Sequence, residues 1–293
     1  MMRQMMRQGD KVAIVCCSNG QKATYKEKIS ELSKTLQKIG LIPVFSDFIY
    51  AEESVFAGSA RERADSLMSF YRDKEIQMIF DISGGDIANE ILPYLDFEVI
   101  AGSNKEFWGY SDLTTIINAI YAKTGKKSVL YQVRNLIYED SDRQLLHFTN
   151  TVMNEKRDLW NFEYRFLQGK ELSGIVVGGN IRCLLKLAGT EYWPDMTDKI
   201  LLLESLGGTA AQMVTYLSQL QQIGVFNKIS GVLLGTFTEM EREQSIPSIE
   251  ELVMRYAGTQ LSIAKTQNIG HGTDSKGIVI GEYYDLFSPF FIS

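Results

Sequence analysis

Short apolar runs alternate with amphipathic segments along this 293-residue chain, and this alternation constrains the possible folds more than any other feature. Runs of strand length lie at 11–17 (KVAIVCC), 41–47 (LIPVFSD) and 76–82 (IQMIFDI). Between them, residues 22–39 carry apolar side chains at helical spacing up to a helix-ending Gly40, and 53–72 also suits a helix. Strands that alternate with helices form a parallel sheet covered on both faces.

The same alternation continues through the rest of the first 130 or so residues. The turn SGGD at 83–86 leads into a predicted helix at 87–95. Strands are then predicted at 97–102 and 106–110, and a helix at 112–122. Ligands of such folds bind at the carboxyl ends of the strands. Both strand-to-helix turns, SGGD and GYSDLT, are therefore candidates for a functional site.

The pattern changes at residue 137 and resumes at 173, which predicts three parts. Residues 1–136 form an N-terminal α/β domain, 137–172 a charged and aromatic helical connector without clear strands, and 173–293 a second α/β domain. In the second domain, strands are expected at 173–180, 199–204, 229–237 and 277–282, and helices at 180–188, 209–223 and 247–258.

Composition excludes several classes of protein. Hydrophobic residues make up 45% of the chain and charged residues 23%, which favours a packed core over disorder. The net charge of −6 argues against a nucleic-acid binder. The chain shows neither the apolar run of a secretory signal nor the ~18 apolar residues of a membrane span, so we expect no membrane association and a cytoplasmic location. Cys16, Cys17 and Cys183 lack metal-site spacing and suit ordinary thiols.

The scarcity of histidine narrows any serine–histidine chemistry. Of the two histidines, His147 lies in the connector and His271 in a glycine-flanked loop before a strand. His271 better suits a catalytic base, although a simple turn histidine is the alternative. Such a base needs an orienting carboxylate, and Glu204 ends an apolar strand at the sheet rim. A surface glutamate that begins a turn is the competing interpretation of Glu204.

Ser111 in GYSDLT is either a helix N-cap or a nucleophile on a strand-to-helix turn, and one turn can serve both roles. The second glycine of a GxSxG elbow is replaced by Leu113. Backbone N–H groups in the Gly84–Gly85 turn and at Asp112 could form an oxyanion hole. A simple tight turn, or a phosphate site at the helix terminus, remains open for the glycine pair.

Taken together, seven stretches resemble the serine LD-carboxypeptidase family, which includes the microcin C self-immunity proteins. In chain order they are GDKVAIVCCSNG (9–20), DISGGDIANEILPYLD (81–96), WGYSDLTTI (108–116), GIVVGGN (174–180), KILLLE (199–204), ISGVLLGTF (229–237) and IGHGTDSKGIVIG (269–281). The family usually has Pro-Ser where this chain has Cys17-Ser18.

The resemblance implies a site in the cleft between the two domains. Ser111 would be the nucleophile, His271 the general base and Glu204 its orienting carboxylate. Gly85 and Asp112 would donate backbone N–H groups to the oxyanion. No metal or cofactor is implied, and a homodimer is expected.

The substrate class stays open between two branches of that family. One branch releases terminal D-alanine from a murein tetrapeptide, and the other cleaves peptidyl or aminoacyl nucleotides. Many LD-carboxypeptidases carry Arg and Tyr around the glycine pair, where this chain has Ser83 and Asp86, which looks closer to the immunity branch. Gly84 and Asn180 are candidate substrate contacts, with a helix N-cap as the alternative for Asn180.

Two further points stay open at this stage. The connector aromatics Trp160, Phe162 and Tyr164 could shape a lid or simply pack. A competing hypothesis of another class is a non-catalytic module that binds a peptide or nucleotide in the cleft.

Overall fold

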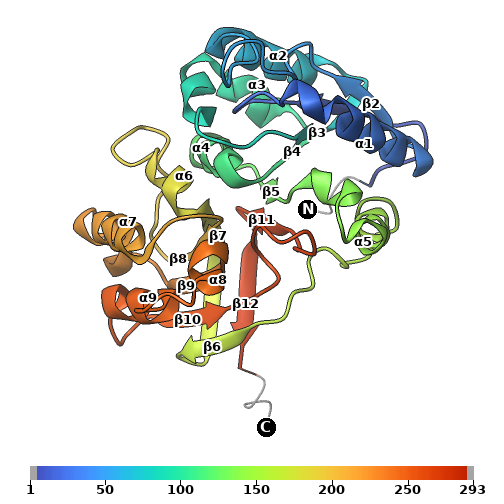
Figure 1. Ribbon diagram of the computed structural model, residues 1–293. Coiled ribbons are helices and arrows are strands. Elements are labelled where there is room, and N and C mark those ends of the chain that lie inside the picture. Colours follow the sequence, from blue (N-terminus) through green and yellow to red (C-terminus); the bar gives the residue numbers. More distant parts are fainter. Residues whose placement is uncertain (1–4, 289–293) are drawn as a thin grey trace.

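The computed structural model describes residues 5–288, which form two α/β domains, each built on a six-stranded sheet (Figure 1). The first sheet has the strand order β11-β5-β4-β3-β1-β2, and the second has the order β12-β7-β8-β9-β10-β6. Strands β1–β5 run parallel to their neighbours, as do β7–β10, whereas β11, β12 and β6 are antiparallel edge strands. The prediction of two α/β domains is confirmed.

The strands and helices have the following bounds. The strands are β1 Lys11–Val15, β2 Ile42–Phe45, β3 Ile76–Asp81, β4 Glu106–Gly109, β5 Ser128–Leu130, β6 Arg165–Gln168, β7 Glu171–Asn180, β8 Lys199–Ser205, β9 Gly231–Phe237, β10 Ser262–Lys265, β11 Ile278–Ile280 and β12 Tyr283–Phe287. The α-helices are α1 Lys26–Lys38, α2 Ala60–Arg72, α3 Phe97–Gly102, α4 Thr114–Thr124, α5 Ser141–Met153, α6 Ile181–Leu185, α7 Ala210–Gln222, α8 Thr238–Arg242 and α9 Ile249–Ala257. The 3-10 helices are η1 Ala23–Tyr25, η2 Ala88–Tyr94, η3 Ser111–Leu113, η4 Val133–Ile137 and η5 Val225–Asn227.

Local capping explains two departures from the predicted elements. Residues 97–102 form helix α3 rather than a strand, because the Asp96 carboxylate accepts the Val99 N–H at 3.1 Å and starts a helix. The helix predicted from residue 53 begins only at Ala60, since Ser59 and Glu62 form a reciprocal capping box there.

The connector is helical over only part of its length. It contains α5, but Arg165–Gln168 form strand β6 and β7 begins at Glu171, so its C-terminal end belongs to the second sheet. The prediction of a connector without strands is therefore wrong there. Charged and aromatic residues concealed β6, and an exposed edge strand tolerates such residues, while β7 begins two residues before its predicted start.

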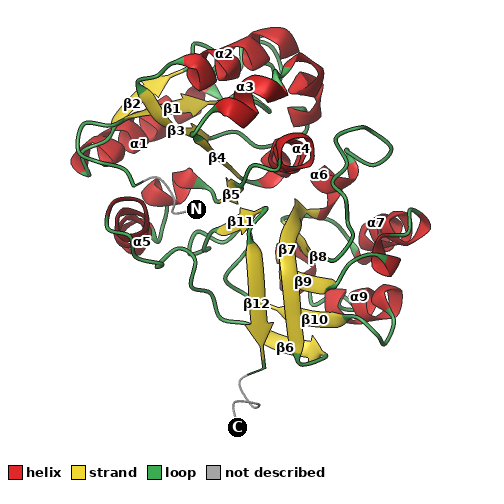
Figure 2. Ribbon diagram, turned by 180° about the vertical axis from the view of Figure 1, so that it is seen from behind, coloured by secondary structure: helices red, strands yellow, loops and turns green. Residues whose placement is uncertain are grey.

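The last part of the chain belongs to both domains. The strand predicted at 277–282 for the second domain is β11, which pairs antiparallel with β5 of the first sheet. The chain then returns as β12 and pairs with β7 of the second sheet. Figure 2 shows the two strands following one another across the junction of the domains. A sequence-local pattern cannot assign a strand to a sheet, because pairing partners lie far away in the chain.

Helices cover both faces of the first sheet. Helices α1 and α5 pack on one face and α2, α3 and α4 on the other. Trp108 of β4 packs edge-on against Phe148 of α5 at a ring-centroid distance of 5.9 Å and lies 5.6 Å from Trp160. Phe162 and Tyr164 also pack against buried apolar side chains. These contacts favour packing over a lid as the role of the connector aromatics.

A polar face of α4 joins the two domains. The buried Asn118 side chain donates to the Gly178 carbonyl at 2.9 Å and accepts the Gly178 N–H at 2.8 Å. Thr114 Oγ1 accepts the Asn180 N–H at 3.0 Å, and Thr115 Oγ1 donates to the Cys183 carbonyl at 2.9 Å. The C-terminal end of β7 and helix α6 are thus hydrogen-bonded to the helix that follows Ser111.

We expect Asn118→Ala to lower the free energy of unfolding by about 2–4 kcal/mol, because both backbone groups of Gly178 would stay buried without a partner. Urea denaturation compares it with Asn154→Ala at the exposed end of α5, where a change within about 0.5 kcal/mol is expected. Equal unfolding midpoints for the two variants would contradict this account of the interface.

Candidate active site

A cavity of about 310 Å³ lies between the two domains. The first domain contributes Gly85, Asp86 and Ser111 to its wall. The second domain contributes Asn180, Arg182, Ser205, Leu206, Gly207, Gly208, Gln212 and Tyr216. Three of the predicted site residues therefore line one cavity: Gly85, Ser111 and Asn180. Gly84 is close to it, since a Cβ added there would lie 3.9 Å from Ser111 Cβ.

Ser111 occupies a sharp turn between β4 and α4. Its φ of +56° lies in the left-handed region, which is uncommon for a non-glycine residue and is found at strained functional turns. The expectation that Ser111 caps the helix is wrong. The N-cap positions of η3 and α4 are Tyr110 and Leu113, and neither makes a side-chain cap bond. An N-cap residue needs extended backbone, which a left-handed residue does not have.

Glu204 and His271 form a buried pair in the second domain. Glu204 is the penultimate residue of β8 and is completely buried, and its Oε2 lies 2.7 Å from His271 Nδ1. His271 Nε2 is buried and has no hydrogen-bond partner among the described residues. This geometry orients the ring so that Nε2 is left available as a base. The described structure has no hydrogen bond between His271 and Ser111, as is common for catalytic pairs without substrate.

Tyr110 brings this pair to the serine turn, and the sequence analysis gave it no role. Its hydroxyl donates to Glu204 Oε2 at 3.0 Å, and its ring packs edge-on against His271 with centroids 4.9 Å apart. Burial and the adjacent Glu204 carboxylate raise the pKa of Tyr110 well above its usual value, so the hydroxyl keeps its proton and remains a donor. The sequence around Tyr110 gives no sign of this role, because its partner Glu204 lies 94 residues away in the chain.

The glycine-pair turn is held against the second domain. Gly85 has φ +116°, and an added Cβ would lie 2.2 Å from the Asn19 side chain, so both conformation and space require glycine. The Gly85 carbonyl accepts from Arg182 at 2.9 Å. The N–H groups of Gly85 and Asp112 have no acceptor among the described residues. Gly85 lines the cavity, so its N–H is open to a ligand there, whereas Asp112 is completely buried and its role as a second donor stays a prediction.

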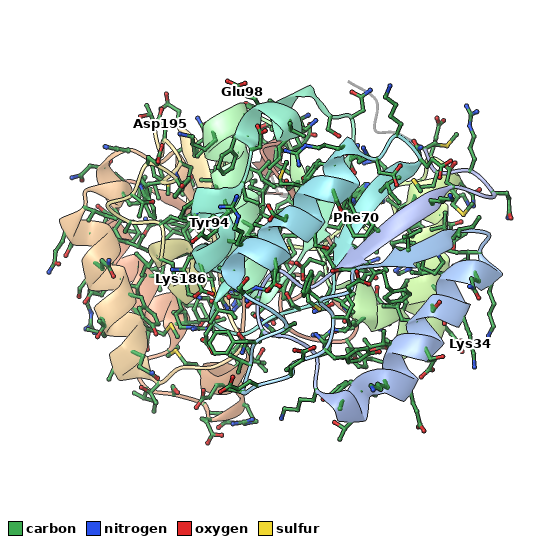
Figure 3. The ribbon with its side chains drawn as sticks, turned by 90° about the horizontal axis from the view of Figure 1, so that it is seen from above. Lys34, Phe70, Tyr94, Glu98, Lys186 and Asp195 are labelled. Carbon is green, nitrogen blue, oxygen red and sulfur yellow. The ribbon has the colours of Figure 1, made fainter. Side chains whose placement is uncertain are left out.

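The Asp112 carboxylate has a structural role that the sequence analysis missed. It is completely buried, accepts from Ser18 Oγ at 2.7 Å and the Ala88 N–H at 2.9 Å, and forms an ion pair with Lys186. Lys186, labelled in Figure 3, comes from the end of α6 in the second domain. The carboxylate therefore ties β1, η2 and the second domain to the serine turn.

The position of Asn180 is compatible with both roles considered for it, helix N-cap and substrate contact. Its side-chain oxygen caps α6 by accepting the Cys183 N–H at 3.3 Å, and the residue also lines the cavity. The cap accounts for an asparagine there without any substrate, so contact with substrate stays a prediction.

The part of the chain that the structure describes shows little sign of a metal site, a reactive thiol or a membrane-spanning helix. Residues 5–288 contain no group of three or more His, Cys, Asp and Glu side chains placed to hold a metal ion. Burial raises the pKa of Cys16, Cys17 and Cys183, which keeps these free thiols protonated. None of the helices within 5–288 combines the length and the apolar character needed to cross a membrane.

Family models identify the chain in two parts. The model of the LD-carboxypeptidase N-terminal domain matches residues 12–131, and that of the C-terminal domain matches 173–286. The chain belongs to the LD-carboxypeptidase family, peptidase S66. The resemblance inferred from sequence motifs is thereby confirmed.

Individual members of the LD-carboxypeptidase family match this chain over almost its full length. A probable murein peptide carboxypeptidase of Bacillus subtilis is 26% identical over 94% of this chain and 88% of the relative. The microcin C7 self-immunity protein MccF of Escherichia coli is 24% identical over 94% of each chain. The solved structure of MccF in complex with glutamyl sulfamoyl guanosine covers 98% of this chain and 95% of its own, at 21% identity and a TM-score of 0.86. The two-domain arrangement is thus shared within the LD-carboxypeptidase family.

We expect Asp112→Ala to lower the free energy of unfolding by about 3–5 kcal/mol, because Lys186 would lose its partner at a mostly buried position. The matched control is Asp86→Ala, which removes an ion pair with Arg182 whose side chains are 65% and 40% exposed and which should cost less than about 1 kcal/mol. Urea unfolding midpoints measure both. A similar loss in the two variants would refute the structural role of Asp112.

Proposed function

We propose that this protein is a serine carboxypeptidase that cleaves an amide near the C-terminus of a small peptide through an acyl-enzyme. The observation that carries the proposal is the Glu204–His271 pair at 2.7 Å with an unpartnered, buried Nε2, held beside the Ser111 turn by Tyr110. A solvent-facing histidine would not need such an arrangement. Membership of the LD-carboxypeptidase family supports the same class of reaction.

In the proposed reaction, Ser111 Oγ attacks the scissile carbonyl carbon while His271 Nε2 takes the hydroxyl proton. Glu204 accepts from His271 Nδ1–H and stabilises the imidazolium that forms. The C–N bond then breaks, His271 gives the proton to the leaving amine, and an ester remains on Ser111. Water, deprotonated by His271, hydrolyses the ester and restores the serine.

The oxyanion formed in both steps would accept from the N–H groups of Gly85 and Asp112. The left-handed φ of Ser111 turns the chain sharply before Asp112, as nucleophile turns of other hydrolases do. The Gly85 N–H belongs to the peptide unit whose carbonyl, that of Gly84, accepts the Asn19 N–H at 3.1 Å, and Arg182 holds the next carbonyl from the other domain. A free N–H held rigidly needs little reorganisation when charge develops.

Two substrate classes follow from the relatives. The first is a murein peptide, in keeping with the name of the Bacillus subtilis relative, a probable murein peptide carboxypeptidase, and we propose a tetrapeptide that loses its terminal D-alanine. The alternative is a peptidyl or aminoacyl nucleotide, favoured by the MccF structure with glutamyl sulfamoyl guanosine. Asp86 in the glycine turn, which is paired with Arg182, also favours the alternative. Asn180 and Gly84 would contact either substrate.

Ser111→Ala should lower the hydrolysis rate by a factor of about 10⁴–10⁶, because the nucleophile of a serine triad is removed. Ser69→Ala on the exposed side of α2 is the control and should keep full activity. Steady-state hydrolysis by the purified variants is the measurement. Ligand binding without turnover in the unmodified protein would instead support a non-catalytic binding module.

A paired assay decides between the substrate classes. Purified protein is given an L,D-linked murein tetrapeptide and, separately, an aminoacyl sulfamoyl adenylate, with Ser111→Ala beside each. We expect release of D-alanine that the variant loses. Serine-dependent cleavage of the nucleotide alone would reject the murein assignment and keep the serine mechanism.

The predicted homodimer and cytoplasmic location rest on the family resemblance and sequence composition, and both stay predictions.

A further inference from the structure

Tyr110 occupies a position that links the two halves of the proposed triad. It precedes Ser111 directly in the first domain, and its hydroxyl reaches Glu204 in the second domain at 3.0 Å. The side chain is 2% exposed and does not line the cavity beside Ser111. It therefore cannot be explained by contact with substrate.

The Tyr110 hydroxyl donates to one of the two carboxylate oxygens of Glu204, Oε2. Glu204 Oε2 receives both the Tyr110 hydroxyl and His271 Nδ1, whereas Oε1 is buried without a partner among the described residues. A buried carboxylate with an unpartnered oxygen would gain by rotating toward another donor. The Tyr110 hydroxyl opposes this rotation and keeps Oε2 facing the imidazole.

The ring of Tyr110 acts on the histidine itself. It packs edge-on against the His271 ring at 4.9 Å, which restricts rotation of the imidazole. One side chain thus fixes the Glu204 carboxylate through its hydroxyl and the His271 imidazole through its ring, while its backbone begins the serine turn.

We propose that Tyr110 is a positioning residue that sets the Glu204–His271 pair relative to Ser111 across the domain boundary. The inference rests on the proposed serine mechanism and goes beyond it, because it assigns the alignment of the triad to a residue that touches neither substrate nor the reacting atoms. Tyr110 acts through Glu204.

Removal of the hydroxyl has a definite consequence for proton transfer. The titratable groups that contact the pair are Tyr110 and, for each other, Glu204 and His271. A donor to the carboxylate disperses its negative charge. Without the donor, Glu204 presents more charge to the imidazole and stabilises its protonated form. The acid limb of kcat/KM should then move to higher pH.

Tyr110→Phe tests the proposal. We expect kcat to fall about tenfold to hundredfold, the range for loss of a hydrogen bond to a charged group, with KM little changed. The control is Tyr71→Phe, an equally buried tyrosine of α2, with unchanged kcat. Circular dichroism and thermal unfolding verify that both variants are folded.

A second measurement separates positioning from a general loss of packing. In a Glu204→Gln background, adding Tyr110→Phe should cost less than threefold in kcat, because the partner of the hydroxyl has already been altered. Full additivity of the two losses would overturn the proposal, as would an unchanged kcat and acid limb in Tyr110→Phe.

The failure of this inference is distinguishable from failure of the proposed function. Full activity of Ser111→Ala would remove the serine mechanism altogether. Loss of activity in Ser111→Ala together with wild-type behaviour of Tyr110→Phe would remove only the role of Tyr110.

Discussion

The pair of hydrogen bonds between the Asn118 amide and the backbone of Gly178 is the contact on which the site geometry depends. It joins the middle of α4 to β7 in a fixed register, since both the donor and the acceptor of one peptide segment are used. Glycine allows this close approach: a Cβ on the neighbouring Gly179 would lie 2.7 Å from Thr114 Oγ1. Because α4 follows Ser111 and β7 pairs with β8, the serine turn and Glu204 become parts of one rigid unit.

The histidine loop is placed by the crossing of the chain between domains. His271 lies between β10 of the second sheet and β11 of the first, so each end of its loop is anchored in a different sheet. The buried Gln144 of α5 donates to the Thr273 carbonyl at 3.0 Å and the Ser275 carbonyl at 2.9 Å. The connector therefore does more than span the domains, because its helix supports the loop that carries His271.

The sequence predicts those features that depend on local pattern. Glu204 at the end of an apolar run and His271 between glycines could both be singled out, and the structure brings them to 2.7 Å. The order of the family-like motifs along the chain then identified Ser111 as the candidate nucleophile. The error at Ser111 is also informative, because serine before a helix suggests a cap, whereas the left-handed φ that excludes a cap leaves no trace in the sequence.

The residues that escaped prediction are buried polar groups with distant partners. Tyr110, Asp112 and Asn118 lie in or near one short stretch, and their partners in the second domain lie 60 to 94 residues away. Such residues look like ordinary helix or turn positions until the second domain is in place. The same reason explains β11, whose apolar run indicates a strand but not its sheet.

The arrangement of the glycine turn bears on how this chain selects a substrate. Ser83, where many LD-carboxypeptidases carry arginine, is completely buried and bonded to Asp81, so it faces the core rather than the cavity. Asp86 is paired with Arg182 of the second domain. With both turn positions engaged in this way, the proposed hydrolase would discriminate between substrates through the second-domain wall of the cavity, where Leu206 is 53% exposed. That wall follows directly on Glu204 in β8, so in the proposed mechanism the loop that contacts substrate continues the strand that carries the orienting carboxylate.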